Sequence, residues 1–477
     1  MGQDVDQTRF GRRDRGRFMR HLRAETAALH ALLEHDALSS HPPMAGLELE
    51  AWLIDDDGRP APCNDAFLAH VDSPDIVTEL GRFNIELNVP PRPLAGDGLG
   101  RLAADLEATW ERCRAAASSM GLQVVAIGIL PTLDDADLTL ANLSDRARYR
   151  ALNEQVLRQR NGRPVTLDIA GPDGDSLCSK HCDVMLEAAA TSFQVHLQVP
   201  AGDIVRTYNA ALIASAPVVA LSANSPMLFG RRLWPETRIP LFEQALDIGA
   251  REDGRHPGLG RVGFGSGYTG YSMLECFREN LECFEPLLPV TLDEPAERLP
   301  HLRLHNGTVW RWNRPLIGFD DDGRMHLRIE HRPMAAGTSL PDMMAHLAFS
   351  IGLVASLAGQ PQAPELRLPF DEARRNFYAA ARFGLDAPLC WIDGRNLCAG
   401  ELLAELAVQA RTGLASLGVD DALASRWMAL IEARLARRRT GASWQLERLF
   451  ALGGDRAALT LDYVRRQADG TPVHLWQ

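Results

Sequence analysis

Four short segments that lie far apart in the chain share one strict pattern, in which apolar and polar side chains alternate. They are residues 47–53, 83–89, 193–199 and 327–332. Because side chains alternate between two faces along a β-strand, each segment is predicted to be a strand with one apolar and one polar face. Such strands are typical of an antiparallel sheet that packs on a core through one face.

The polar faces of these four segments have an unusual composition. Taken alone, each is explained by a solvated sheet face. Taken together, their crowded carboxylates repel one another unless cations compensate, and glutamates with one histidine are ligands that Mg²⁺ or Mn²⁺ accepts. The residues of the polar faces are Glu48, Glu50, Asn84, Glu86, Asn88, Gln194, His196, Gln198, Arg328, Glu330 and Arg332.

The charges on these faces point to a nucleotide as well as to metal ions. Glu48, Glu50, Glu86 and Glu330 carry four negative charges, and a nucleoside triphosphate adds about four more near neutral pH. About two or three divalent ions, together with Arg332, would be needed to hold both in one pocket. Phosphoryl transfer relies on such clamps of metal ions and arginine.

Lysine is nearly absent from the sequence, and this limits how phosphates could be bound. Lys180 is the single lysine among fifty basic residues, and no G-x-x-x-x-G-K motif is present. A phosphate-binding P-loop is therefore excluded, and any phosphate is expected to be bound by arginine and metal ions.

Six short motifs in a fixed order resemble the second family of glutamate–cysteine ligases, the carboxylate–amine ligases of the glutamine synthetase-like superfamily, plant-type enzymes included. The resemblance covers about residues 40–360. The motifs are residues 46–50, 85–88, 191–197, 221–226, 308–315 and 329–333.

The resemblance implies an α+β fold of the glutamine synthetase-like type. A curved, mainly antiparallel sheet would hold the metal ions on its concave face, with helices on its outer face and a helical C-terminal extension. It also implies an ATP-dependent ligase active in glutathione biosynthesis. A substrate carboxylate, expected to be the side chain of glutamate, attacks the γ-phosphate, and an amine such as cysteine displaces phosphate from the acyl phosphate to give an amide.

The resemblance also assigns roles to individual residues. Arg332 is expected to neutralise the transferred phosphoryl group and, with Glu330, to be catalytic. Either Arg311 or Arg314 is expected to bind the carboxylate of the amino acid, since a guanidinium suits a bidentate contact. Gln194 replaces a histidine of some relatives and is expected to contact substrate or to support a ligand. The expected ligands of Mg²⁺ (or Mn²⁺) are Glu48, Glu50, Glu79, Glu86, His196 and Glu330.

Two other functions stay open at this point. The same superfamily includes guanidino-type phosphotransferases, which would yield a phosphorylated acceptor and no amide. A non-catalytic metal- or metabolite-binding relative is the second alternative, although such a relative is expected to lack ligands that this chain retains. His331, which alternation places on the apolar face, is predicted to be a packed core histidine.

The remaining sequence predicts three regions, residues 1–40, 41–360 and 361–477. Helices are expected at 8–36 and 101–120, and the last region is predicted to be helical at 371–385, 399–417 and 420–453, packed on the catalytic domain. The apolar stretch 210–229 contains two prolines and several polar side chains, so a buried helix with its exit turn is expected there rather than a membrane span. Residues 320–323 read as a turn.

The net charge and the cysteine content limit which binding partners and which cellular compartment are expected. The net charge of −12 argues against nucleic acid or an anionic membrane. No signal peptide is evident and the eight cysteines are dispersed, so a cytoplasmic protein with reduced thiols is expected. For Cys178, His181 and Cys182, incidental thiols are favoured over zinc. The partners are then small amino acids and amines, and a homodimer is one of the oligomeric states left open.

The glycine-rich segment 258–270 contains Gly265-x-Gly267-x-x-Gly270. No hydrophobic strand precedes it, so a dinucleotide-binding Rossmann turn is excluded. The segment is expected to be a surface loop. At residues 254–270 it is either inert or a mobile flap that shields an acyl phosphate from water.

Overall fold

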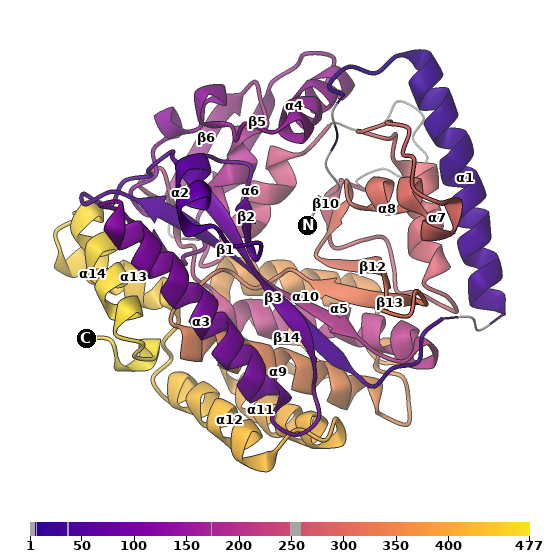
Figure 1. Cartoon of the computed structure of the whole chain (residues 1–477). Coiled ribbons are helices and arrows are strands. Elements are labelled where there is room, and N and C mark those ends of the chain that lie inside the picture. Colours follow the sequence, from indigo (N-terminus) through magenta and orange to yellow (C-terminus); the bar gives the residue numbers. More distant parts are fainter. Residues whose placement is uncertain (1–4, 6, 36–37, 173, 249–258) are drawn as a thin grey trace.

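Seven strands among the described residues form one curved antiparallel sheet. The structure is a computed structural model that describes residues 5, 7–35, 38–172, 174–248 and 259–477. The spatial order of the strands is β12-β13-β7-β1-β3-β2, and β4 pairs with β1. Their bounds are β1 Met44–Ile54, β2 Ile76–Thr78, β3 Asn84–Pro93, β4 Gln123–Val125, β7 Phe193–Gln198, β12 Asn313–Phe319 and β13 Met325–His331 (Figure 1).

The four segments predicted from alternation are the four adjacent strands β13, β7, β1 and β3. Every pair in this sheet is antiparallel, so the predicted fold class, a curved and mainly antiparallel sheet covered by helices, is confirmed. The turn predicted at 320–323 joins β12 to β13. The strand register therefore brings the polar residues of four distant segments onto one concave face.

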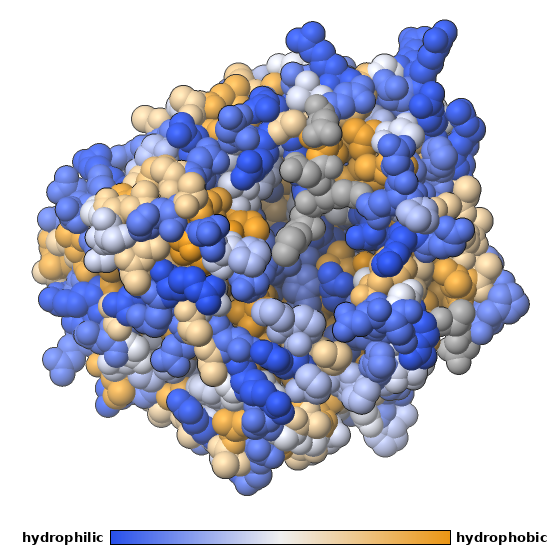
Figure 2. All heavy atoms as spheres, in the orientation of Figure 1, coloured by the Kyte–Doolittle hydropathy of each residue, from blue (hydrophilic) through white to orange (hydrophobic). Residues whose placement is uncertain are grey.

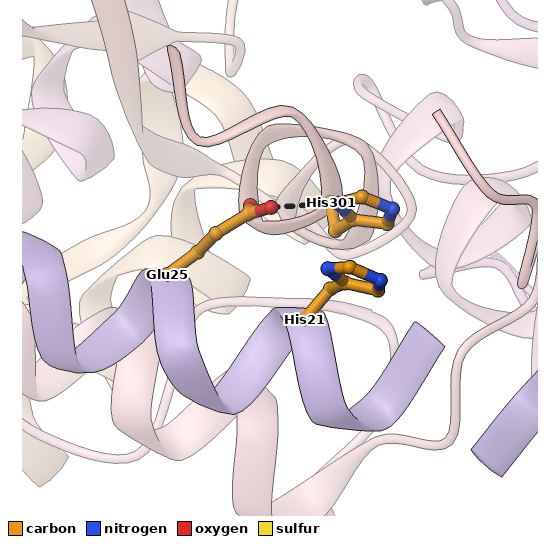
Figure 3. Close-up of side chains that lie close together, drawn as sticks. All are labelled: His21, Glu25 and His301. Atoms are coloured by element: carbon orange, nitrogen blue, oxygen red, sulfur yellow. Dashed lines mark hydrogen bonds and ion pairs between the residues drawn. The ribbon is translucent and has the colours of Figure 1, made fainter. Parts of the chain in front are cut away.

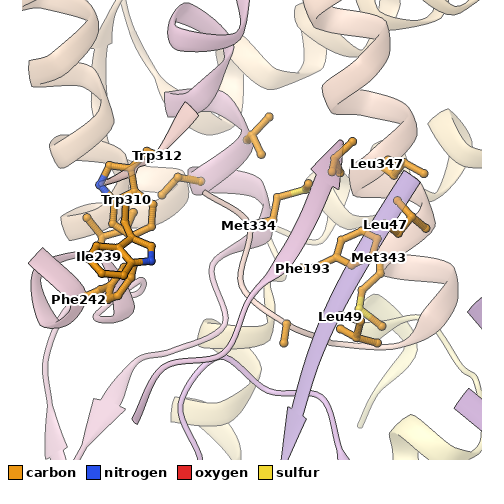
Figure 4. Close-up of a cluster of buried hydrophobic side chains, with 14 of the residues drawn as sticks. Leu47, Leu49, Phe193, Ile239, Phe242, Trp310, Trp312, Met334, Met343 and Leu347 are labelled. Carbon is orange, nitrogen blue, oxygen red and sulfur yellow. The ribbon is translucent and has the colours of Figure 1, made fainter. Parts of the chain in front are cut away.

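The apolar face of the sheet is buried against a long helix, α9 (Leu340–Ala358). Figure 4 shows Leu47 and Leu49 of β1 and Phe193 of β7 beside Met343 and Leu347 of this helix. All five side chains are buried. Removal of this apolar surface from water holds the sheet and its outer helices together.

Two helices of the core, α9 and α5 (Ile204–Ser222), are long and apolar enough to span a membrane. Both are mostly buried inside the protein, and the predicted buried helix with its exit turn at 210–229 is confirmed. The neighbouring helices are α3 (Gly98–Ser119), α10 (Phe370–Phe383), α11 (Ala399–Ser416) and α12 (Asp421–Ala436). In Figure 1, α9, α11 and α12 lie together below the sheet.

Helices α9 and α11 meet through two glycines. A Cβ atom added at Gly413 would overlap the carbonyl oxygen of Gly352, and one at Gly352 would overlap the carbonyl oxygen of Ala410. Any larger side chain would push the two helices apart, so the contact depends on residues without side chains.

The last helix, α14 (Arg456–Ala468), contacts α13 (Gly441–Ala451) and the chain near the end of β4. Gln467 accepts a hydrogen bond from the Ala126 amide at 3.0 Å and donates one to the Ala126 carbonyl at 2.8 Å. The Tyr463 hydroxyl donates to the same carbonyl at 3.0 Å. The single helix predicted at 420–453 is two helices, α12 and α13, because the Thr440 side chain caps the start of α13. The predicted three-region division stays a prediction.

Helix α1 (Arg12–Glu34) lies along one side of the molecule and is anchored by Glu25 (Figure 1). Figure 3 shows the Glu25 carboxylate pointing at the His301 ring, whose Nδ1 lies 2.6 Å away, and the His21 ring stacked on that ring. The amide of Leu302 donates to the second Glu25 oxygen at 2.8 Å. Glu25 therefore ties α1 to the start of α8 (Pro300–Asn306).

Smaller elements complete the fold. The glycine-rich segment departs from its prediction. Strand β10 pairs in parallel with β11, and Arg261, Val262 and Phe264 are buried, so residues 261–264 are not a surface loop. Residues 254–258 lie outside the described residues, and the flap stays a prediction.

The other elements are α2 Asn64–Val71, α4 Ala147–Gln159, α6 Arg238–Ala245, α7 Leu274–Cys283, β5 Val165–Ala170, β6 Ser176–His181, β8 Met227–Leu228, β9 Arg231–Arg232, β10 Val262–Gly263, β11 Trp310–Arg311, β14 Pro388–Cys390 and β15 Asn396–Cys398.

Candidate active site

The concave face of the sheet forms the floor of a cavity of about 930 Å³. This volume is in the range that holds small-molecule substrates. Figure 2 shows the corresponding face of the molecule hollowed near its centre. Of the predicted site residues, those that line the cavity are Glu48, Glu50, Glu79, Glu86, Gln194, His196, Arg314, Glu330 and Arg332.

The first group of potential metal ligands comprises Glu48, His196 and Glu330. They come from β1, β7 and β13, and Glu330 lies opposite His196 in the register. His196 Nε2 lies 3.1 Å from Glu48 Oε1 and 3.9 Å from Glu330 Oε1. Three strands thus bring three residues, predicted from segments up to 282 positions apart, into mutual contact.

Two arginines hold Glu330 in its ionised form. Arg314 Nε donates to Oε2 at 2.8 Å and its Nη2 donates to Oε1 at 2.9 Å, while Arg332 Nη1 donates to Oε2 at 3.1 Å. Burial alone would raise the pKa of Glu330, but Arg314, Arg332 and His196 outweigh it and lower this pKa to about 2. Glu330 is therefore an anion throughout the neutral range.

The imidazole of His196 is oriented from behind by Arg328, whose Nε donates to His196 Nδ1 at 3.1 Å. A neutral imidazole that accepts through Nδ1 carries its proton on Nε2, which faces Glu48. Nε2 can bind a metal ion only when its proton moves to Nδ1. The hydrogen bond from Arg328 to Nδ1 must then break. Burial raises the pKa of Glu48, but His196 and Arg332 act together against it, so this pKa lies well below its ordinary value.

The second group, Glu50, Glu79 and Glu86, lies beside the first on β1, β3 and the segment after β2. Glu50 and Glu86 are opposite one another in the register. Burial raises the pKa of all three, to about 7 for Glu50 and well above the ordinary value for Glu79, and the carboxylates raise one another further. Glu79 donates a hydrogen bond to Glu86, so at neutral pH a proton lies between these two carboxyl groups.

Gln194 connects the two groups. Its Oε1 accepts from Arg332 Nη1 at 2.5 Å and its Nε2 donates to Glu50 Oε1 at 2.8 Å. The amide of Ser192 donates to the other Glu50 oxygen at 2.6 Å. The neutral amide therefore orients a cation and an anion at once, which is a supporting role rather than a ligand role.

The donor sets of both groups fit a divalent cation. In each group the potential ligand atoms lie within 4.8 Å of one another, close enough for one ion to reach them with small adjustments. In the second group all three potential ligands are carboxyl groups that burial and mutual repulsion destabilise as anions, so a cation would favour their ionised forms once the shared proton is lost. A third cluster, His21, Glu25 and His301, lies outside the cavity, and its Glu25 oxygens already accept the hydrogen bonds that anchor α1.

The structure separates Arg311 from the cavity. Its guanidinium is buried against Glu279 and donates to Asn280 Oδ1 at 2.9 Å, and it is not among the lining residues. Arg314 lines the cavity but is bound to Glu330. The core position predicted for His331 is confirmed: it is buried and its Nδ1 contacts Asn313 Oδ1 at 2.7 Å.

Sequence patterns missed several cavity residues. Glu187 lies in a short helical turn before β7, outside any alternating segment, and its Oε2 has no hydrogen-bond partner among the described residues. Burial, with Glu50, raises its pKa to about 7. Arg303 lines the cavity from α8. Arg328 was placed on the polar face by alternation, yet no role followed from the sequence.

Comparison with solved structures identifies the fold. The glutamate–cysteine ligase of Francisella tularensis, solved in complex with AMP, is 12% identical and has a TM-score of 0.53, over 91% of this chain and 89% of that one. A bifunctional glutathione synthetase from Pasteurella multocida is 11% identical, with a TM-score of 0.49, over 93% of this chain and 55% of that one. A search of curated proteins found no matching sequence.

The fold shared with the Francisella ligase is a curved antiparallel sheet, and it presents two groups of potential metal ligands and two arginines in one cavity. The chain belongs to glutamate–cysteine ligase family 2, whose sequence profile matches residues 44–445. The family resemblance predicted from six short motifs is confirmed.

Proposed function

We propose that the protein is an ATP-dependent ligase that joins the side-chain carboxylate of glutamate to cysteine or another amine. The observation that carries the proposal is the placement of the two groups of potential metal ligands and Arg332 around one cavity. Family membership supports the reaction type, and AMP in the Francisella ligase supports an adenine nucleotide as the second substrate.

In the proposed reaction, an oxygen of the substrate carboxylate attacks the γ-phosphorus of ATP, and the bond to the bridging oxygen breaks to release ADP. The amine nitrogen then attacks the acyl carbon and inorganic phosphate leaves, while the nitrogen loses a proton. Arg332, held by Glu330 and Gln194, presents a fixed positive charge to the transferred phosphoryl group.

Glu50, Glu79 and Glu86 would hold one Mg²⁺ or Mn²⁺, and Glu48, His196 and Glu330 would hold another. When bound, such ions offset the negative charge of the triphosphate that the carboxylates would otherwise repel. Arg314 keeps Glu330 ionised and oriented for this purpose. Gln194 keeps Glu50 pointed at the same region.

The test is ADP release with Mg²⁺, ATP and glutamate, with and without a panel of amines headed by cysteine. We expect ADP release that depends on both the carboxylate and the amine, with the matching amide detected by mass spectrometry. A phosphorylated acceptor without an amide would replace the ligase by a phosphotransferase. The Glu330→Gln variant should lose this activity, whereas full activity in that variant would contradict the site.

A further inference from the structure

Arg328 is a charged side chain on the cavity wall that no carboxylate of the described residues neutralises directly. It projects from β13 on the same face as Glu330 and lines the cavity. Its Nε donates to His196 Nδ1 at 3.1 Å, and its Nη1 lies 3.4 Å from His326 Nε2. Within the part of the chain that the structure describes, its Nη2 donates to no protein atom.

The other two arginines of this strand pair differ in this respect. Arg314 and Arg332 both form ion pairs with Glu330. Among the described residues, no carboxylate oxygen lies within 4.0 Å of Arg328, and Glu330 and Glu48 act on it from longer range. A guanidinium stays protonated at any physiological pH, so a full positive charge faces the cavity.

The position of Arg328 is determined by neighbours that leave its charge intact. His326 Nδ1 bonds to Asp320 Oδ1 at 2.8 Å, which leaves the lone pair of Nε2 to face Arg328. Gly318 lies opposite His326 in the register of β12 and β13. A Cβ atom at Gly318 would overlap both Arg328 Nη1 and the His326 ring, so this glycine provides the space in which the guanidinium lies.

A second cation lies on the same side of the cavity. Arg303 of α8 lines the cavity, packs over the Phe319 ring at 5.6 Å and forms an ion pair with Glu294 at 3.3 Å. It also acts electrostatically on Arg328. Glu50, Glu79 and Glu86 lie at the β3 side of the sheet instead. Arg328 and Arg303 therefore add positive charge at the β13 side of the cavity, beside Glu48 and Glu330, and this charge suits an anion.

We propose that Arg328 is an anion-binding group of this cavity in addition to Arg332 and takes a phosphate or a carboxylate of a substrate. The inference rests on the proposed function only in naming the two sources, the phosphates of ATP and the carboxylates of glutamate. A planar guanidinium with a free edge forms charge-assisted hydrogen bonds with either group.

The test is isothermal titration of the wild type and of variants with three probes, MgATP, L-glutamate and inorganic pyrophosphate. Arg328→Gln should weaken binding of either MgATP or glutamate tenfold to a hundredfold and leave the other within threefold, which identifies the source of the anion. Arg328→Lys should recover part of the loss because it retains the charge. Arg324→Gln removes an exposed arginine of the same hairpin, outside the cavity, and should match the wild type.

Unchanged binding of all three probes by a folded Arg328→Gln protein would overturn the inference, as would a wild type that binds none of them. If that variant does not fold, Gly318→Ala displaces the guanidinium while keeping its charge. It should weaken the same probe at least threefold, and unchanged affinity there overturns the inference. A wild type that binds an anion through Arg328 but forms no amide contradicts only the proposed ligase.

Discussion

Arg314 and Glu330 are directly opposite one another on β12 and β13 and are joined by two parallel hydrogen bonds of 2.8 and 2.9 Å. The fork of the guanidinium matches the two carboxylate oxygens, so the pair determines where Glu330 points as well as its charge. A carboxylate held in this way keeps one orientation while the charge on the substrates changes during phosphoryl transfer.

Replacement of Arg314 by lysine should lower kcat about tenfold to a hundredfold with a smaller change in KM. Lysine keeps the charge but offers a point contact in place of the bidentate one, so Glu330 would lose its orientation and not its ionisation. Steady-state ADP release measures the effect. The matched control is Arg324→Lys, and equal losses in the two variants would count against the Arg314–Glu330 pair.

Glu79→Gln and Glu86→Gln should both reduce the rise in melting temperature that Mg²⁺ or Mn²⁺ causes in the wild type, and the part due to Glu48, His196 and Glu330 should remain. In a chelator, Glu79→Gln should be at least as stable as the wild type, because the amide can donate to Glu86 as the protonated carboxyl does. Differential scanning fluorimetry with and without metal tests this. A normal metal-dependent shift in Glu79→Gln would remove Glu79 from the ligand set.

Without metal, the carboxyl groups of the site should lower the stability as the pH rises from about 4.5 through about 7, and further until Glu79 releases its proton. Glu50 and Glu187 have pKa values of about 7 and that of Glu79 lies well above its ordinary value, so the folded protein retains protons that the unfolded chain has released. The free energy of unfolding then decreases with pH, by about 1.4 kcal/mol for each unit of pKa difference. Added Mg²⁺ should flatten the profile. A flat profile in chelator alone would show that these carboxyl groups are not coupled to folding.

His305 should contribute to acid unfolding outside the site. Its Nε2 is 2.9 Å from the Asn280 carbonyl oxygen, its Nδ1 is buried without a partner among the described residues, and burial lowers its pKa to about 4. Stability is retained above pH 6.5 and lost as the pH falls from 6.5 to 4, by about 3 kcal/mol.

The His305→Gln variant should therefore lose less stability between pH 6.5 and 4 than the wild type, since glutamine can still donate to Asn280. Urea unfolding across this range measures the slope, with His30→Gln as an exposed histidine control. Identical slopes for His305→Gln and the wild type would exclude the buried imidazole as the cause.

Gly413→Ala should destabilise the protein by about 1–3 kcal/mol or more, because the added methyl would overlap the backbone of α9. Gly16→Ala, at an open position in α1, should instead raise stability by about 0.5–1 kcal/mol through helix propensity. Chemical denaturation compares the two. A neutral Gly413→Ala would mean that α9 and α11 can separate at little cost.

Alternation was sufficient to predict β1, β3, β7 and β13, because strand periodicity is a local property of the sequence. It also placed Glu48, Glu50, Glu86, His196 and Glu330 on one face. Their division into two groups depends on register, which joins Glu330 to His196 and Glu50 to Glu86, and register follows from contacts between distant strands.

Other site residues left no periodic signal. Glu187 is in an irregular turn, and the contrast between Arg311 and Arg314 depends on which partner each side chain meets. Arg328 was on the predicted face, yet its lack of a carboxylate partner is visible only once its neighbours are in place. The observed helix ends differ from the predicted ones for a similar reason. At Thr440, for example, a side-chain cap begins α13.

The hydrogen bonds of Gln467 to both backbone groups of Ala126 set the order in which the protein can be completed. Ala126 leaves the ribosome more than three hundred residues before its partner does. A nascent chain that has not reached α14 leaves these buried backbone groups unpaired, so the native state becomes available only after Gln467 has been made. A stop codon before Gln467 should therefore yield a protein that is degraded rather than one that is merely shorter.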